Sequence, residues 1–332
     1  AAWRHSRNFA RNDRARAGIA VSDMDDILLD PFKRLLAHIC TPSVIRDEES
    51  RSGLAQCWGE LEQSGFINAL LPETRGGAGL SLGDVFPLVV ACGEAALPAP
   101  FAETMVARAL LDKRGADLPT GAAIVLAPPS PVIPLAAKAS HALVTANGRL
   151  ALIALTAGAS DPFRAGGYAD QLKGETLLEV AAGGIDLQAW AAALAAAQMS
   201  GMMMRILDMS LRYANERQQF DRPLSKFQAI QHQLAIGAEY AVSAHTAAAI
   251  AMSGQHFDPL RAAAAKVCAG EAASKLCAIA HAVHGAIGVT EEYDLQIYTR
   301  RLKQWALAFG NERYWADVLG SARLGTEAGT SA

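Results

Sequence analysis

Apolar residues recur every three to four positions between residues 24 and 116, which is the period of amphipathic helices. The pattern predicts helices over 27–36, 54–65, 82–93 and 101–113. Ser81, followed three residues later by Asp84, is typical of a helix start, because both side chains can accept hydrogen bonds from backbone amides there. We therefore expect an N-terminal helical domain over 24–116.

Residues 117–186 follow a different pattern, in which prolines interrupt short apolar runs. The runs AAIVL, ALVTANGRLALIAL and TLLEVAAG predict strands. Asn147-Gly148 lies between two of these runs, and this pair favours a two-residue hairpin turn. The segment is short, so we expect a reduced β-sheet domain.

Helical spacing returns at residue 187. Ala-rich segments predict helices over 187–217, 226–253, 258–284 and 294–319, separated by Pro, Gly and Ser residues. Four long helices with short connections form an antiparallel bundle, here expected over 187–332. The predicted fold class is therefore mainly α with a small β-domain between two helical domains.

The first 23 residues are rich in Arg and Ala and precede Met24. Such a segment is either an arginine-rich transit peptide or a flexible tail outside the fold. We expect a flexible tail over 1–23.

Composition and charge exclude several functions. Of the 332 residues, 51% are apolar and 19% charged, which is enough for a large core and excludes wholesale disorder. The 30 Lys and Arg residues against 33 Asp and Glu residues lack the basic excess of a nucleic-acid binder. The sequence contains no run of 18 uninterrupted apolar residues, so we do not expect a membrane span.

The cysteines and histidines do not predict a metal site or a disulfide framework. The five cysteines are scattered and include no C-x-x-C pair, and the eight histidines show no metal-ligand spacing. This usage is typical of a reducing compartment, so we expect a cytoplasmic protein.

The segments at 61–85, 212–235 and 282–303 together resemble the acyl-CoA dehydrogenase family. RYANERQQFDRPLSKFQAIQHQLA (212–235) resembles its Arg-x-x-Phe-Gly-x-x-Leu-x-x-Phe-Gln signature, and AVHGAIGVTEEYDLQIYTRRLK (282–303) resembles its Gln-x-His-Gly-Gly-x-Gly segment and the following helix. LEQSGFINALLPETRGGAGLSLGDV (61–85) resembles its N-terminal loop and helix. The resemblance implies FAD at a subunit interface and α,β-dehydrogenation of an acyl-CoA thioester.

The resemblance implies that six residues bind the cofactor: Arg217, Phe220, Phe227, Gln228, Gly285 and Gly288. Arg217 resembles the arginine that crosses the dimer interface to the FAD pyrophosphate, which a guanidinium fork suits. The chain departs from the family pattern where Asp221 and Ala286 replace glycines and Ala282 replaces glutamine. Ordinary core packing is the alternative role for both phenylalanines, and the expected role of His284.

The residue that abstracts the α-proton is missing from both positions where the family has it. The resemblance places these positions at Phe309 and Ala191, and neither side chain can accept a proton. Glu312 is a weaker candidate, with a solvated surface role as its alternative. Residues 117–186 also lack the Thr-Glu-Pro-x-x-Gly-Ser-Asp and Trp-Ile-Thr-Asn runs that hold the isoalloxazine ring in the family.

These departures favour a dehydrogenase subunit that needs a longer partner carrying the base and the flavin cradle. The family includes bacterial members built in this way, some acting on steroid side-chain thioesters. A homomeric enzyme that uses Glu312, and an interaction subunit without catalysis, are the alternatives. The expected partners are an acyl-CoA substrate and either a second copy or a full-length dehydrogenase chain.

Overall fold

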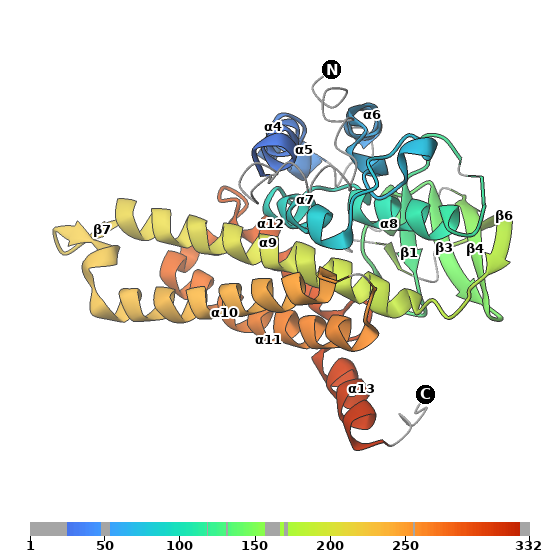
Figure 1. Ribbon diagram of the computed structural model, residues 1–332. Helices are drawn as coiled ribbons and strands as arrows, with labels where there is room; N and C mark the ends of the chain where they lie inside the picture. The colour runs from blue at the N-terminus through green and yellow to red at the C-terminus, as the bar shows by residue number, and fades with distance from the viewer. Residues whose placement is uncertain are drawn as a thin grey trace, which may run out of the picture. The chain divides into compact units, whose positions relative to one another are not determined.

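The computed structural model describes residues 25–47, 54–117, 119–130, 132–156, 167–168, 172–254 and 256–325 (Figure 1). The predicted tail over 1–23 lies outside these residues. The chain divides into two compact units, which meet in sequence between Leu187 and Gln188.

The first unit begins with short helices. They are η2 (Asp25–Leu29), α4 (Asp30–Ile39), α5 (Pro42–Asp47), α6 (Leu54–Ser64), η3 (Phe66–Asn68), η4 (Glu73–Arg75), α7 (Leu82–Glu94) and α8 (Phe101–Asp112). The capping prediction is confirmed: Ser81 Oγ accepts from the Asp84 amide, and the Asp84 carboxylate accepts from the Ser81 amide at 2.8 Å. Phe32 is fully buried, and its ring lies 5.1 Å from that of Phe66.

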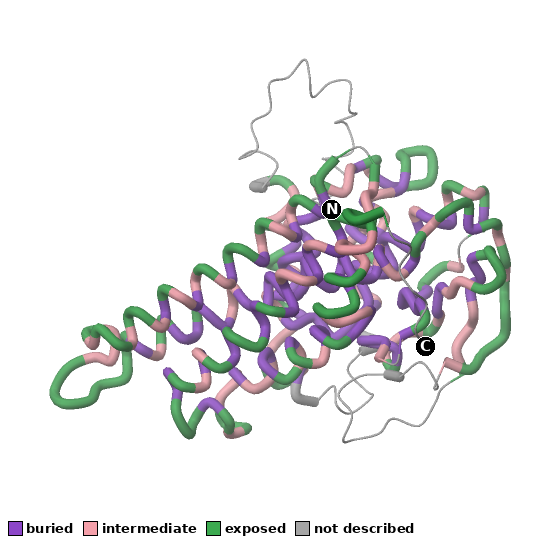
Figure 2. Tube along the Cα trace, turned by 90° about the horizontal axis from the view of Figure 1, so that it is seen from below, coloured by how far each residue is buried: buried purple, intermediate pink, exposed green. Residues whose placement is uncertain are grey.

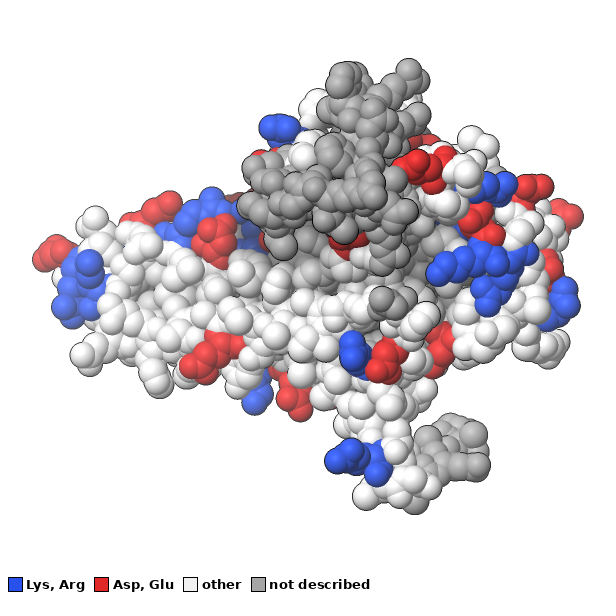
Figure 3. Space-filling model, viewed as in Figure 1, with Lys and Arg blue, Asp and Glu red and all other residues white. Residues whose placement is uncertain are grey.

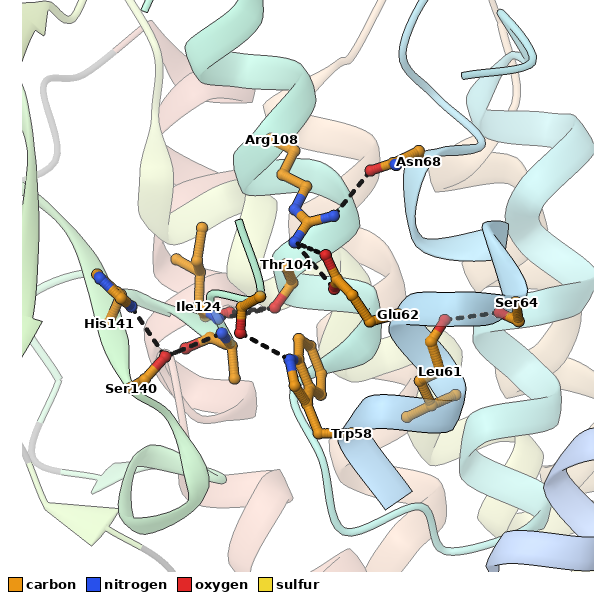
Figure 4. A network of polar contacts seen from close by, with 12 residues as sticks. Trp58, Leu61, Glu62, Ser64, Asn68, Thr104, Arg108, Ile124, Ser140 and His141 are labelled. Carbon is orange, nitrogen blue, oxygen red and sulfur yellow. Dashed lines mark hydrogen bonds and ion pairs between the residues drawn. The ribbon is translucent and has the colours of Figure 1, made fainter. Parts of the chain in front are cut away.

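Polar contacts join these helices to one another (Figure 4). Arg108, on α8, donates to both carboxylate oxygens of Glu62 on α6, at 2.7 and 3.0 Å, and to Asn68 Oδ1 at 2.8 Å. Thr104, one turn earlier, accepts from the Ile124 amide at 2.8 Å. Because both Arg108 and Thr104 are buried, these bonds hold α8 in one position against α6 and the sheet.

The sheet of the first unit has four strands in the order β1-β3-β4-β6. These are β1 (Ile124–Ala127), β3 (His141–Ala146), β4 (Arg149–Leu155) and β6 (Gly174–Ala181); β2 (Val132–Ile133) pairs separately with β5 (Gly167–Tyr168), and η5 spans Ala136–Lys138. β1 is parallel to β3, and the other neighbours are antiparallel. Asn147 and Gly148 have φ values of 50° and 72°, which confirms the predicted tight hairpin.

The second unit consists of long helices. They are α9 (Leu187–Glu216), α10 (Gln228–Met252), α11 (Pro259–His284), α12 (Leu295–Leu307) and α13 (Glu312–Leu324), with the hairpin β7 (Gln218–Gln219)–β8 (Arg222–Pro223), η7 (Leu224–Lys226) and η8 (Gly285–Val289) between them. The helix predicted over 294–319 is interrupted at 308–311. The reason is that Phe309 and Gly310 have φ values of 57° and 92°, which no helix accommodates.

Small residues allow α10 and α11 to pack closely. Ala241, Ala244 and Ala248 on α10 are fully buried, and a Cβ added to Gly237 would lie 3.1 Å from Leu276 Cδ1 of α11. In Figure 2 the buried positions line the facing sides of the bundle helices and the exposed positions line the outer sides. The Ala-rich segments are therefore the core of this unit.

One segment, Pro259–Val289, is long and apolar enough to cross a membrane by length and composition alone. It contains α11, which packs against α10, α12 and α13 within the second unit. A core helix of a bundle passes the same test, so this segment is weak evidence for a membrane span.

Candidate functional site

The β7–β8 hairpin presents Phe220, one of the predicted cofactor residues, at its tip. Gln219 pairs with Arg222, so the loop contains only Phe220 and Asp221. Both loop residues have positive φ, 53° and 60°, which is the geometry of a tight two-residue hairpin turn. Asp tolerates this conformation better than most residues, so the turn forms although Asp221 replaces the family's glycine.

Phe220 and Phe227 pack against each other rather than in the core of the bundle. Their ring centroids are 6.3 Å apart in an edge-to-face arrangement, and Phe220 is 87% exposed. The Arg222 guanidinium lies over the Phe227 ring at 4.0 Å. These contacts stiffen an exposed aromatic surface at the tip of the hairpin.

Arg217 and Gln228 are exposed at opposite ends of this hairpin segment. The Arg217 carbonyl accepts from the Leu224 amide at 2.8 Å, which fixes its backbone. The Arg217 side chain forms no ion pair with any residue that the structure describes. Gln228 begins α10, whose first turn carries no acidic residue and whose preceding residue provides no side-chain cap. A helix start of this kind attracts anions.

The glycine turn at the end of α11 contains the other two predicted residues. Gly285 has φ 65° and ψ −144°, a conformation nearly restricted to glycine, and a Cβ there would meet no atom within 4 Å. Gly288 is buried, and a Cβ there would lie 2.9 Å from the Cβ of His284. The Gly285 backbone therefore faces open space, whereas Gly288 is required by internal packing.

The two positions at which the resemblance places the catalytic base, Phe309 and Ala191, lack a carboxylate and are both buried. Phe309 is 3% exposed and Ala191 is 1% exposed. The Phe309 carbonyl accepts from Trp315 Nε1 at 2.9 Å. A Cβ on Gly310 would lie 2.5 Å from the Tyr314 ring, so the 308–311 turn is closely packed. Neither position holds a group that could accept a proton from a substrate.

Glu312 lies beside a buried lysine that the sequence pattern did not single out. Lys266, on α11, is fully buried and donates to the carbonyls of Ala306 and Gly310 at 2.8 and 3.0 Å. Burial lowers the pKa of Lys266 to about 7, and the Glu312 carboxylate opposes this shift. Glu312 itself is exposed in the first turn of α13, with Oε2 placed against Gly270. These contacts fit a helix-terminal carboxylate near a lysine better than a base in an enclosed site.

Charges of both signs occur at the hairpin end of the bundle (Figure 3). The segment 216–226 contains three basic residues, Arg217, Arg222 and Lys226, and two acidic ones, Glu216 and Asp221. The excess of one positive charge is small, so an anion there would depend on individual side chains rather than on a broad basic field.

Comparison with known proteins supports the family resemblance that the three sequence segments indicated. The model of the acyl-CoA dehydrogenase C-terminal domain matches residues 187–322, which include the hairpin, the glycine turn and the 308–311 turn. Acyl-CoA dehydrogenase IpdE2 of Mycobacterium tuberculosis is 30% identical over 258 residues, which are 72% of this chain and 77% of that protein. The chain belongs to the acyl-CoA dehydrogenase family. Its members are flavoprotein oxidoreductases that act on CH–CH groups.

Other acyl-CoA dehydrogenases match over nearly the whole chain. IpdE2 of Mycolicibacterium smegmatis is 29% identical over 308 residues, 88% of this chain and 96% of that protein. The Tcur3481–Tcur3483 steroid ACAD (G363A variant) superposes with a TM-score of 0.76 at 24% identity, covering 89% of this chain and 96% of that one. The ChsE4–ChsE5 complex of M. tuberculosis gives 0.75 at 21% identity, covering 93% and 99%. These superpositions confirm the predicted fold class.

The residues present fit part of an FAD molecule. An exposed guanidinium without an ion-pair partner among the described residues, an uncapped helix start and a glycine backbone facing open space suit a nucleotide diphosphate. The positions of the family base offer only a buried phenyl ring and a buried methyl group. The fit therefore extends to the nucleotide half and not to the reacting half.

Proposed function

We propose that this chain is the base-lacking subunit of a heteromeric FAD-dependent acyl-CoA dehydrogenase. Arg217, Gln228 and Gly285 would contact the nucleotide half of an FAD whose ring is held by the partner chain. When bound, FAD supplies the acceptor for the hydride that leaves the β-carbon of the substrate. The partner chain would supply the carboxylate that takes the α-proton.

One observation carries this proposal: Arg217, Gln228 and Gly285, which are proposed to contact a neighbour's cofactor, are exposed, while both base positions are apolar and buried. A homomeric enzyme would need a carboxylate within hydrogen-bond reach of the substrate's α-carbon. Glu312 is the nearest carboxylate in sequence to Phe309, and its position beside Gly270 and Lys266 gives it another role.

The proposed substrate class is a bulky acyl-CoA, such as the thioester of a steroid side chain. The support is the similarity to the Tcur3481–Tcur3483 steroid ACAD. The ChsE4–ChsE5 complex likewise contains two named chains, which supports a hetero-oligomer here. A cytoplasmic location is also proposed, because the five scattered cysteines include no C-x-x-C pair, a usage typical of a reducing compartment.

The test is co-expression of this chain with a full-length acyl-CoA dehydrogenase chain encoded by a neighbouring gene. FAD content is measured by absorbance at about 450 nm, and dehydrogenation by dye reduction. We expect the flavin band and activity from the mixture, and neither from this chain alone. Arg217→Ala should lower FAD retention, whereas Arg323→Ala, an exposed arginine in the last turn of α13, should not.

Two results would contradict the proposal. A yellow and active preparation of this chain alone would indicate a homomeric enzyme. A mixture whose FAD content and activity do not change with Arg217→Ala would indicate an interaction subunit without a role in cofactor binding.

A further inference from the structure

Three rings connect the end of α9 to the end of α11. The Tyr213 ring stacks on the His284 ring, with centroids 4.5 Å apart and an interplanar angle of 24°. Tyr293, just before α12, lies 5.0 Å from His284 and 6.0 Å from Tyr213. We call Tyr213, His284 and Tyr293 the aromatic stack. It joins α9 to the chain between the end of α11 and the start of α12, which is about 70 residues further on.

The aromatic stack lies next to both segments that are proposed to contact the neighbour's FAD. The Arg217 amide donates to the Tyr213 carbonyl at 2.8 Å, so Tyr213 is one helical turn before Arg217. His284 immediately precedes Gly285. The stack therefore joins the start of the hairpin to the start of the glycine turn.

His284 is held in one orientation. Its Nδ1 donates to the Ala280 carbonyl at 2.7 Å, and a Cβ on Gly288 would clash with it. Its Nε2 is buried and has no hydrogen-bond partner among the described residues. Burial lowers the pKa of His284, in keeping with a neutral ring between two tyrosines.

An apolar cluster extends this connection to α10. Its buried part consists of Ala214, Leu234 and Val283. Ala214 directly follows Tyr213 in sequence, and Val283 directly precedes His284. Tyr213 packs against this cluster together with Leu224, which closes the hairpin segment. The hairpin, the start of α10 and the glycine turn are therefore connected through the same apolar cluster.

From this geometry we infer that Tyr213 and His284 are positioning residues for the shared cofactor. They hold the Arg217 backbone and the Gly285 backbone in place, so that less conformational entropy is lost when both segments reach the diphosphate of the neighbour's FAD. This inference rests on the proposed function. It adds a role for residues that do not themselves touch the cofactor.

The test is a double-mutant cycle on the complex of this chain with its FAD-binding partner, with the FAD dissociation constant as the readout. Tyr213→Leu should weaken FAD binding about tenfold, because one ring stack is lost. Tyr213→Phe keeps the ring and should remain within about twofold of wild type. In the Arg217→Ala background, Tyr213→Leu should weaken FAD binding less than it does in the wild type, because the part of its effect that acts through Arg217 is lost.

A second measurement uses this chain by itself. Amide hydrogen exchange should become faster at Leu224 and at Thr290 in Tyr213→Leu, while Tyr213→Phe should resemble wild type. These amides bond to Arg217 and Ile287, one in each of the two segments that the stack joins. Faster exchange across the whole bundle would indicate general destabilisation instead and would overturn the inference.

The outcomes separate the two proposals. If Arg217→Ala weakens FAD binding and Tyr213→Leu does not, the inference is wrong and the proposed function stands. Equal effects of Tyr213→Leu with and without Arg217 would also overturn the inference. If Arg217→Ala leaves FAD binding unchanged, the proposed function fails, and the inference fails with it.

Discussion

Lys266, in the N-terminal third of α11, donates a hydrogen bond from its buried side-chain nitrogen to the carbonyl of Gly310 across 3.0 Å. A second bond to Ala306 places the same nitrogen at the C-terminal end of α12, where helix carbonyls lack partners. A positive charge is favoured there, yet burial opposes it. The conformation of the 308–311 turn is thus stabilised by hydrogen bonds from Lys266, whose side chain can titrate.

The pKa of Lys266 predicts how stability depends on pH. Burial lowers it from 10.5 to about 7 in the folded chain. Between about pH 7 and 10.5 the unfolded chain binds a proton that the folded chain does not, so the free energy of unfolding should rise with pH. The slope from this group approaches about 1.4 kcal/mol per pH unit. Lys266→Met should remove it, as measured by urea unfolding at pH 7, 8 and 9.

Lys113→Met is the matched control, because Lys113 is exposed at the end of α8. The free energy of unfolding of the Lys113→Met variant should depend on pH in the same way as that of the wild type. A Lys266→Met variant with the wild-type slope would show that the folded chain keeps this amine protonated throughout.

Gly310 should tolerate no side chain. A Cβ there would lie 2.5 Å from Tyr314 Cδ1 and 2.7 Å from Trp315 Nε1, and φ is 92°. We expect Gly310→Ala to lower the free energy of unfolding by about 2–4 kcal/mol. At Gly320, inside α13, a Cβ would meet nothing within 4 Å, so Gly320→Ala should raise it by about 0.5–1 kcal/mol. Equal effects in thermal or urea unfolding would contradict this packing.

The same turn shows what a sequence pattern cannot reveal. Helical spacing continues through Phe309, so the pattern predicted one helix where the structure has two. The positive φ at Phe309 depends on Trp315 and Lys266, which bind the turn's carbonyls from separate positions. By contrast, the Asn147-Gly148 hairpin and the Ser81–Asp84 cap were predictable, because short-range geometry determines both.

The candidate site likewise has features that could be predicted from the sequence and features that could not. Local motifs pointed to the hairpin around Arg217 and to the turn at Gly285. The stacking of Tyr213 on His284 could not be predicted, since it depends on how α9 and α11 pack. Lys266 was missed because a single lysine in an Ala-rich helix is usually exposed, and only the carbonyls at the end of α12 explain its burial.

The ion pair between Arg108 and Glu62 should contribute more to stability than an exposed pair. Arg108 is nearly buried, so Arg108→Met would leave the Glu62 carboxylate and Asn68 without their partner. We expect a loss of about 2–4 kcal/mol in the free energy of unfolding. Arg149 and Glu179 form a bond of similar length with both side chains half exposed, and Arg149→Met should cost less than about 1 kcal/mol. Similar losses in chemical denaturation would contradict this difference.

Asp221 places a carboxylate in the hairpin that is proposed to face a diphosphate. Removing that charge should tighten FAD binding to the complex by a few-fold, roughly, and the gain should shrink at high salt. Asp221→Asn removes the charge and keeps a side chain that tolerates positive φ. Asp221→Gly also relaxes the backbone at φ 60°. If only Asp221→Gly tightens binding in FAD titrations, backbone strain rather than charge is the limiting factor.

Glu312→Gln addresses the missing base directly. If the partner chain supplies the base, this variant of the complex should dehydrogenate acyl-CoA within about twofold of wild type, because Glu312 is exposed at the start of α13. Exchange of the substrate's α-protons with deuterated water provides a second readout of proton abstraction. A loss of about 100-fold or more in both rates, with FAD content unchanged, is the signature of a lost general base. That result would assign proton abstraction to this chain and would contradict its role as the base-lacking subunit.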